Sequence, residues 1–488
     1  MAAATLNLLS CQGKMKVLHL SWMAFFLTFV VWFNHAPLMG MISASLDLTK
    51  AQVSTLMVLN VALTIPARIV IGMLTDRYGP RITYSALLAT VSLPCFVFAW
   101  GDDFTTLAWS RLALGFVGAG FVVGIRMVSE WFPAHELGIA EGIYGGWGNF
   151  GSAAAAMSLP AFALWLGGDD GWRWAITMTG FLSLAFSVIW WTQVSDTPKG
   201  STYFKARNLG GLEVSTRSDY YLLLVMKIPL YLALVVLTWK LSSSSVGLLS
   251  YTSAMFIYVT LMVVLGYDIW STYRVNYRLF NNQIEAHDHY QFKQVAVLSV
   301  LYFATFGSEL AVVSILPIFF AETFSLDLVL AGLVASTYAF MNLMSRPGGG
   351  WLSDRYGRKK TLLLLTAGLA LGYAVMSMIN SNWPLYLAII ATMLCSFFVQ
   401  AGEGAVFSIV PLIKRRLTGQ IAGLTGAYGN VGAVFYLTML TSLTYADFFM
   451  LMSGTAILGL VTLSLLREPK GHMTETSEDG SVVMIKIS

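Results

Sequence analysis

Long apolar runs separated by short polar segments dominate this 488-residue chain. A helix needs about 20 apolar residues to cross the ~30 Å hydrocarbon layer of a bilayer. By this measure the first part of the chain holds six predicted spans, at residues 17–42, 53–75, 82–101, 104–130, 138–166 and 173–194. Six more follow at residues 293–320, 328–352, 360–379, 384–413, 418–444 and 446–466. The pattern predicts an all-α polytopic membrane protein.

Two further apolar runs, 219–239 and 246–270, lie between these two sets of spans. Lys227 and Pro229 interrupt the first run, so a pair of amphipathic helices on the membrane surface is an alternative to an inserted helical hairpin. We favour the hairpin, which gives twelve core spans plus two. The predicted domains are an N-terminal bundle, a central cytoplasmic linker with the hairpin, a C-terminal bundle and a cytoplasmic tail, at residues 1–195, 196–290, 291–467 and 468–488.

The tail after Arg467 is rich in Ser, Thr and Glu, a composition typical of disorder, so we expect a short disordered end. Short loops with Lys and Arg predict which side of the membrane is cytoplasmic. Those assigned inside carry Arg77, Arg81, Arg355, Arg358, Lys359, Lys360, Lys414, Arg415 and Arg416. We therefore expect a multi-pass protein of the cell (plasma or inner) membrane with both termini in the cytoplasm.

Composition excludes several classes of protein. Apolar residues make up 57% of the chain and charged residues 11%, whereas soluble domains average about 25% charged, so a bilayer is the natural solvent. The three cysteines and six histidines are scattered without metal-ligand or triad spacing. We therefore predict no metal, no cofactor, no enzymatic activity and no nucleic-acid partner.

The chain repeats itself in two separate motifs. Residues 72–81 recur as residues 350–359, and their aspartates, Asp76 and Asp354, lie 278 positions apart. The glycine-rich segments 145–151 and 426–432 match in the same way, with asparagines 281 positions apart. Two unrelated motifs with nearly one offset indicate two copies of a six-span unit in the same orientation, as in transporters with parallel repeats.

The first motif, Gly-x-Leu-Ser/Thr-Asp-Arg-x-Gly, resembles the loop between helices 2 and 3 of the major facilitator superfamily. This resemblance implies the major facilitator fold, two pseudosymmetric six-helix bundles. We predict that Asp76, Arg77, Asp354 and Arg355 form a cytoplasmic gate by latching neighbouring helix ends. The alternative is that these are solvated loop charges that only set the topology.

Arg68 and Arg346 lie eight residues before the two motif aspartates. Eight helical residues span about 12 Å, which places both arginines near the middle of the bilayer. Charge at that depth is costly and marks a pathway. Two guanidinium groups at equivalent positions would converge on the central cavity and suit a planar oxyanion through bidentate hydrogen bonds. The alternative, a structural lock with a buried acid, is weaker because helices 2 and 8 lack other acids at that depth.

The glycine-rich motifs place Gly145, Gly148, Gly151, Gly426, Gly429 and Gly432 at spacing three on smooth helix faces. Close helix packing is the commoner role of such glycines. The amides of Asn149 and Asn430 can hydrogen-bond an oxyanion.

Trp-Gly-Asn-Phe-Gly at 147–151 and Tyr-Gly-Asn-Val-Gly at 428–432 resemble the signature of the nitrate/nitrite porter family. The resemblance implies that Arg68 and Arg346 clamp the anion and that Tyr302 hydrogen-bonds it. It also implies aromatic walls at Phe306 and Phe121. The inserted hairpin is similar to that of cyanobacterial nitrate permeases.

We therefore expect a monomeric carrier that takes up nitrate, and nitrite, by alternating access with proton coupling. Glu309 and Glu403 are the candidates for carrying the proton, because a desolvated carboxylate readily binds one. Glu309 could instead make a structural bond, including one to Arg111 or Arg126, although we expect Arg126 to pair with Glu130. A nitrate/nitrite exchanger, a carrier of another small anion such as a carboxylate, and a membrane sensor remain alternatives.

Overall fold

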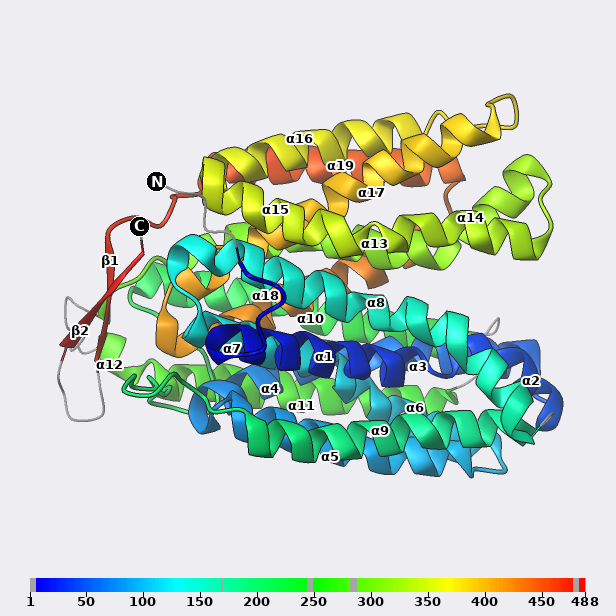
Figure 1. Cartoon of the computed structure of the whole chain (residues 1–488), viewed down its shortest axis with the longest axis horizontal. Coiled ribbons are helices and arrows are strands. Elements are labelled where there is room, and N and C mark those ends of the chain that lie inside the picture. Colours follow the sequence, from blue (N-terminus) through cyan, green and yellow to red (C-terminus); the bar gives the residue numbers. More distant parts are fainter. Residues whose placement is uncertain (1–5, 168–169, 244–248, 281–287, 477–481, 488) are drawn as a thin grey trace.

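The computed structural model describes residues 6–167, 170–243, 249–280, 288–476 and 482–487. Its helices run along the long axis of the molecule in two groups, which lie one above the other in Figure 1. Eleven helices among the described residues are long and apolar enough to cross a membrane. This arrangement agrees with the predicted membrane fold of two bundles.

The N-terminal bundle contains α1 (Gly13–Phe33), η1 (Ala36–Leu38), α2 (Met39–Ser45), α3 (Lys50–Ala62), α4 (Thr64–Tyr78), α5 (Pro80–Ala99), α6 (Phe104–Leu114), η2 (Gly115–Ala119), α7 (Gly120–Trp131), α8 (Ala134–Gly167) and α9 (Gly171–Gln193). The C-terminal bundle contains α13 (Phe292–Phe324), α14 (Leu328–Phe340), α15 (Asn342–Tyr356), α16 (Arg358–Met376), α17 (Leu385–Phe407), η5 (Val410–Leu412), η6 (Arg415–Leu417), α18 (Thr418–Met439) and α19 (Tyr445–Leu463).

Several predicted spans are built from two shorter helices. The second span breaks between α3 and α4 at Leu63, and the eighth breaks between α14 and α15 at Met341. These two breaks lie 278 positions apart, the same offset as the motif aspartates. Pro66 favours the first break because it has no N–H to donate to the preceding turn. Each break lies five residues before one of the intramembrane arginines.

The inserted segment forms two long helices, α10 (Arg217–Ser242) and α11 (Tyr251–Val275), followed by α12 (Tyr277–Phe280). In Figure 1 both long helices run along the same axis as the bundles, and α10 packs against α18, α13 and α3. The Lys227 Nζ lies 2.5 Å from Asp268 Oδ1 of α11, so the charge that interrupts the apolar run is paired inside the hairpin. This geometry fits a membrane hairpin and not a pair of helices lying flat on the surface.

The prediction of a disordered tail is wrong for the described part of it. Strands β1 (His472–Thr476) and β2 (Val482–Lys486) pair antiparallel, with His472 opposite Lys486. The segment Val-Val-Met-Ile-Lys has high β propensity, which an average over the Ser- and Glu-rich tail conceals. Met473 and Ile487 are buried, and the side chain of Glu475 is fully enclosed. The strand pair is therefore docked, at the end of the molecule drawn on the left of Figure 1.

The two bundles meet through glycines where α4 packs on α18 and α15 packs on α8. A Cβ added to Gly72 would lie 2.3 Å from the carbonyl oxygen of Gly419, and one added to Gly350 would lie 1.8 Å from that of Gly138. Side chains larger than hydrogen would hold these backbones apart. Close backbone packing at glycine therefore joins the bundles in both the α4–α18 and the α15–α8 contact. We call this end of the molecule the motif end because Asp76 and Asp354 lie there.

Candidate functional site

Arg68 of α4 lies in the interior between the bundles and is 1% exposed. Its Nη1 donates a hydrogen bond of 2.6 Å to the carbonyl oxygen of Gly426 in α18. The guanidinium carbon lies 5.0 Å from the centre of the Phe306 ring, within the range of a cation–π contact. Among the described residues Arg68 has no carboxylate within ion-pair distance, and its Nε has no hydrogen-bond partner.

Arg346 of α15 is equally buried and approaches the same place from the other bundle. Its guanidinium carbon lies 5.3 Å from the centre of the Phe121 ring, and that of Arg68 lies 5.7 Å from the same centre. The Arg346 Nη2 also donates to the hydroxyl of Tyr302 at 3.1 Å. The structure thus brings the two predicted arginines together around one aromatic ring.

The expectation that both arginines lack an acid partner is wrong for Arg346. Its Nη1 lies 2.8 Å from Glu403 Oε2, and both side chains are almost fully buried. The acid comes from α17, so inspection of helices 2 and 8 alone could not reveal it. Glu403 was predicted as a proton carrier and not as the partner of the anion clamp.

Glu309 belongs to the same polar cluster. Its Oε1 accepts hydrogen bonds from Asn342 Nδ2 at 2.5 Å and from Gln400 Nε2 at 3.4 Å. Gln400 precedes Glu403 by three residues on α17, so the two acidic side chains belong to one buried polar cluster. This cluster reaches Arg346 through Glu403.

The two other arginines considered for Glu309 lie elsewhere. Arg126 pairs with Glu130 at 2.9 Å, as predicted from their spacing of four. Arg111 donates to the carbonyl oxygen of Trp32 and to the side chain of Asn34, which fastens the end of α1. A cation at the C-terminal end of a helix compensates the helix dipole, so Arg111 has a structural explanation.

The glycine-rich motifs give the arginines room. A Cβ on Gly145 would lie 2.7 Å from Arg346 Nε, and one on Gly426 would lie 3.0 Å from Arg68 Nη1. The other motif glycines pack against helices of their own bundle: Gly148 against Phe25, Gly151 against Phe26, Gly429 against Phe306 and Gly432 against Phe303. The motif therefore serves close packing and also lets each guanidinium rest on the helix of the opposite bundle.

The motif asparagines carry unused hydrogen-bonding groups. Asn430 is 0% exposed, and within the described chain neither its amide oxygen nor its amide nitrogen has a partner. Asn149 is 7% exposed, and its Oδ1 also lacks a partner there. Each follows by four residues the glycine that touches an arginine, so it lies on the same helix face. A buried amide without a protein partner is costly, so these groups are available to bond a small molecule between the bundles.

Stacked aromatic rings form the wall of the site. Tyr302 and Phe306 stack at 5.1 Å between ring centres, and Phe121 lies parallel to Tyr302 at 6.5 Å. Phe407 meets Phe121 and Tyr302 edge-on at 4.7 and 4.9 Å. Sequence reasoning missed Phe407, although its spacing of four from Glu403 places both residues on one face of α17.

The motif aspartates lie between the bundles, Asp76 at the start of α18 and Asp354 beside the second turn of α8, in each case a helix of the opposite bundle. Asp76 accepts hydrogen bonds from the backbone N–H groups of Gly419 and Gln420, at 2.7 and 2.8 Å. Asp354 accepts one from Ile139 N at 2.9 Å. The carboxylate of Asp76 is stabilised by the free N–H groups and the dipole of this helix start. Both aspartates join the two bundles at the motif end.

The arginines of the same motif do not take part in this contact. Arg77 and Arg355 are exposed. Arg77 donates to the carbonyl oxygen of Ala206 in the linker, and Arg355 lies over the ring of Trp351. The cations beside the aspartates are instead Arg126, 3.7 Å from Asp76, and Arg358, 3.3 Å from Asp354.

The fold and the duplicated motifs are matched in known proteins. Residues 21–277 and 298–486 match the family model described as Major Facilitator Superfamily. The chain belongs to this superfamily. Two solved structures share the fold at low sequence identity. The human organic anion transporter MFSD10 has a TM-score of 0.64 and 13% identity, and the match covers 93% of this chain and 100% of the other. The proton:xylose symporter XylE has a TM-score of 0.60 and 14% identity, and the match covers 93% of this chain and 95% of the other.

Relatives of higher sequence identity indicate which family within the superfamily the chain resembles. The chain is 46% identical to a protein of Picosynechococcus named "Nitrate/nitrite transporter NrtP", over 96% of both chains. It is 44% identical to the protein of the same name in Nostoc punctiforme, over 97% of this chain and 96% of the relative. These matches confirm the resemblance to the nitrate/nitrite porter family. They also agree with the prediction of a transporter that is not an enzyme.

Proposed function

We propose that this protein takes up nitrate and nitrite across the cell membrane by alternating access between its two bundles. The observation that carries the proposal is the meeting of Arg68 and Arg346, one from each bundle, around the ring of Phe121. Because each bundle contributes one arginine, relative motion of the bundles changes the distance between the two guanidinium groups. The names of the relatives from Picosynechococcus and Nostoc support these anions as substrates.

The charges of the site favour a small anion with one negative charge. Arg68 and Arg346 contribute two positive charges and the ionised Glu309 and Glu403 two negative charges, so the uptake of one proton leaves one positive charge. The remaining positive charge is neutralised by one monovalent anion, and the amides of Asn149 and Asn430 supply donors for its oxygen atoms. A planar oxyanion also fits the planar guanidinium and the stacked rings.

We propose that the carboxyl pair couples transport to protons. An anion that binds between the arginines competes with Glu403 for Arg346, which lies 2.8 Å away. If the displaced carboxylate takes up one proton, the net charge of the buried site stays the same. Simultaneous binding of one anion and one proton is then cheaper than binding of the anion alone, because uncompensated charge in a low-dielectric interior is costly.

We further propose that the motif end faces the cytoplasm and that one chain is a complete carrier. The basic loops at this end support this orientation through the preference of Lys and Arg for the cytoplasmic side. Asp76 and Asp354 act as the gate that holds this side shut, because each accepts a hydrogen bond from the backbone of a helix of the opposite bundle.

The test is uptake of labelled nitrate into proteoliposomes, with and without an inward proton gradient. Arg68→Lys and Arg346→Lys keep the charge but lose the planar fork, so each should reduce uptake by at least tenfold. Arg173→Lys is the matched control, because Arg173 pairs with Asp102 and Asp170, which are both largely exposed.

Unchanged uptake in both site variants would overturn the clamp. Uptake that needs internal nitrite and ignores the proton gradient would identify an exchanger instead of a symporter. Uptake of a small carboxylate in preference to nitrate would reassign the substrate while leaving the fold and the gate intact.

A further inference from the structure

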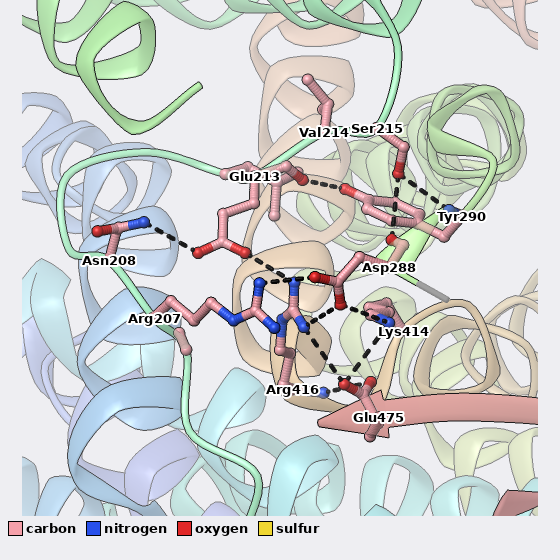
Figure 2. A network of polar contacts seen from close by, with 12 residues as sticks. Arg207, Asn208, Glu213, Val214, Ser215, Asp288, Tyr290, Lys414, Arg416 and Glu475 are labelled. Carbon is pink, nitrogen blue, oxygen red and sulfur yellow. Dashed lines mark hydrogen bonds and ion pairs between the residues drawn. The ribbon is translucent and has the colours of Figure 1, made fainter. Parts of the chain in front are cut away.

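Glu475 fastens the β1–β2 hairpin to the loop that leads into α18. Its Oε1 accepts a hydrogen bond of 3.1 Å from the backbone N–H of Arg416, and its Oε2 lies 3.6 Å from Lys414 Nζ. Strand β1 also accepts from Lys414 Nζ at the carbonyl of Thr474, at 2.8 Å. The Met473 sulfur accepts a hydrogen bond from the backbone N–H of Arg415. Strand β1 thus contacts three consecutive residues of the loop, 414–416. Figure 2 shows Glu475 beside two of them, Lys414 and Arg416.

Arg416 is the centre of this cluster and also binds the linker. Its guanidinium lies 2.7 Å from Asp288 and 2.9 Å from Glu213, and Arg207 lies 2.6 Å from the same Asp288. Figure 2 shows carboxylates from the two ends of the linker segment and from β1 converging on Arg416 and Lys414. Charged groups with several partners at this spacing reinforce one another.

The linker continues from this cluster to the N-terminal bundle. The backbone N–H of Ala206 donates to the carbonyl of Asp76 at 3.0 Å, and Arg126 donates to the carbonyl of Phe204 at 2.8 Å. The linker therefore lies across the boundary between the bundles, with Arg416 as its partner in the C-terminal bundle.

The loop at 414–416 is part of the closed gate. Helix α18 begins at Thr418, and its first N–H groups bind Asp76 of the opposite bundle. Arg415 lies 3.5 Å from Glu130, which also belongs to the opposite bundle. Opening of the motif end requires this loop to move away from α4 and α7.

The tail has a second contact at the start of α16, next to the α15–α8 contact between the bundles. Glu468 accepts a hydrogen bond of 2.6 Å from the backbone N–H of Arg358 at the start of α16. The side chain of Arg358 donates across the boundary to the carbonyl of Ala134 at 2.6 Å. The tail thus contacts both loops that close the motif end.

We propose that the tail is a strap that holds the motif end closed, with Glu468 and Glu475 as its two anchors. Release of the strap frees the loop before α18 and raises the population of the state that is open at this end. The strap would then set how often the carrier opens to this side, and a change that detaches it would regulate transport. The regulation of transport rests on the proposed transport function, whereas the role of the tail in holding the motif end closed does not.

The test measures opening without substrate. A Gln420→Cys reporter, placed in a chain without its three natural cysteines, is labelled with a maleimide in lipid nanodiscs, where both faces are accessible. Gln420 is 5% exposed and lies in the closed contact. Glu475→Gln should accelerate labelling about threefold to tenfold, equivalent to about 0.7–1.4 kcal/mol. Adding Glu468→Gln should accelerate it further.

Two comparisons keep the result specific. Asp447→Asn, which changes a carboxylate bonded to Thr444 at the start of α19, should leave the labelling rate unchanged. A Ser453→Cys reporter, 4% exposed inside the C-terminal bundle, detects general loosening. No acceleration at the Gln420→Cys reporter, or equal acceleration at both reporters, would overturn the strap. Loss of nitrate uptake would leave this test unaffected, so the two proposals fail separately.

Discussion

Arg346 and Glu403 lie 2.8 Å apart in the interior of the protein, and both side chains are almost fully buried. The Arg346 Nη1 and both Glu403 oxygens nevertheless lack an aligned hydrogen bond among the described residues. The contact is therefore a close approach of two opposite charges without an aligned hydrogen bond. A buried pair of this kind is a poor source of stability but a suitable element of a switch.

Glu403→Gln should uncouple uptake from protons. The amide cannot bind a proton in the relevant range and cannot neutralise Arg346, so the site keeps one net positive charge beside the ionised Glu309 and holds the anion more tightly. We expect nitrate counterflow to persist, whereas uptake driven by an imposed pH gradient falls at least tenfold. Both are measured in the same proteoliposomes.

Glu322→Gln is the control for this variant, because Glu322 is exposed and bonded to Tyr445 at the far end of the molecule. It should behave like the parent. If Glu403→Gln retained the full response to the pH gradient, the coupling role of this carboxylate would be excluded.

The sequence allowed the apolar spans and the convergence of Arg68 and Arg346 to be predicted, because periodicity and the repeat offset carry that information. It could not reveal that Glu403 pairs with Arg346. The two residues are 57 positions apart on different helices, and only helix packing makes them neighbours. Arg77 and Arg355 were misjudged for a related reason: the motif fixes their position on the chain but not the direction of the side chain.

Two adjacent glycines of α15 should respond very differently to alanine. A Cβ on Gly349 would lie 2.0 Å from the carbonyl oxygen of Ala401 in α17, whereas one on Gly348 would meet nothing within 4 Å. Gly349→Ala should therefore push α15 from α17 and cost about 1–3 kcal/mol of stability. It should also displace Arg346 from Glu403 and reduce uptake.

Gly348→Ala is the matched control and should be neutral or slightly stabilising, because alanine favours a helix over glycine by about 1 kcal/mol. Thermal denaturation in detergent and nitrate uptake are measured for both variants. Similar losses in the two would contradict the packing described here.

The cluster around Arg416 should make stability depend on pH through Asp288. Burial alone would raise the pKa of this carboxyl, but the charges of Arg416, Arg207 and Lys414 outweigh it and lower the pKa below its ordinary 3.8. A lowered pKa in the folded state means that the ionised carboxylate stabilises the protein above pH 3.8 and that this contribution is lost as the pH falls further.

Asp288→Asn should accordingly lower the melting temperature at pH 7, by an amount equivalent to about 1–3 kcal/mol. The difference from the parent should shrink as the pH approaches 3. Asp102→Asn, which removes an exposed partner of Arg173, should change little at either pH. A difference for Asp288→Asn that is the same at both pH values would show that charge is not the cause.

The inserted hairpin should depend on its internal ion pair. Lys227 is 8% exposed, and its Nζ lies 2.5 Å from Asp268, which also accepts from the hydroxyl of Tyr231 at 3.2 Å. Lys227→Met leaves Asp268 without its cation in an apolar environment, so we expect lower expression and a loss of about 3–5 kcal/mol. Lys227→Met combined with Asp268→Leu removes both charges and should recover most of that loss. A double variant that is as unstable as the sum of the two single variants would show that the charges act independently and that the pair does not hold α10 against α11.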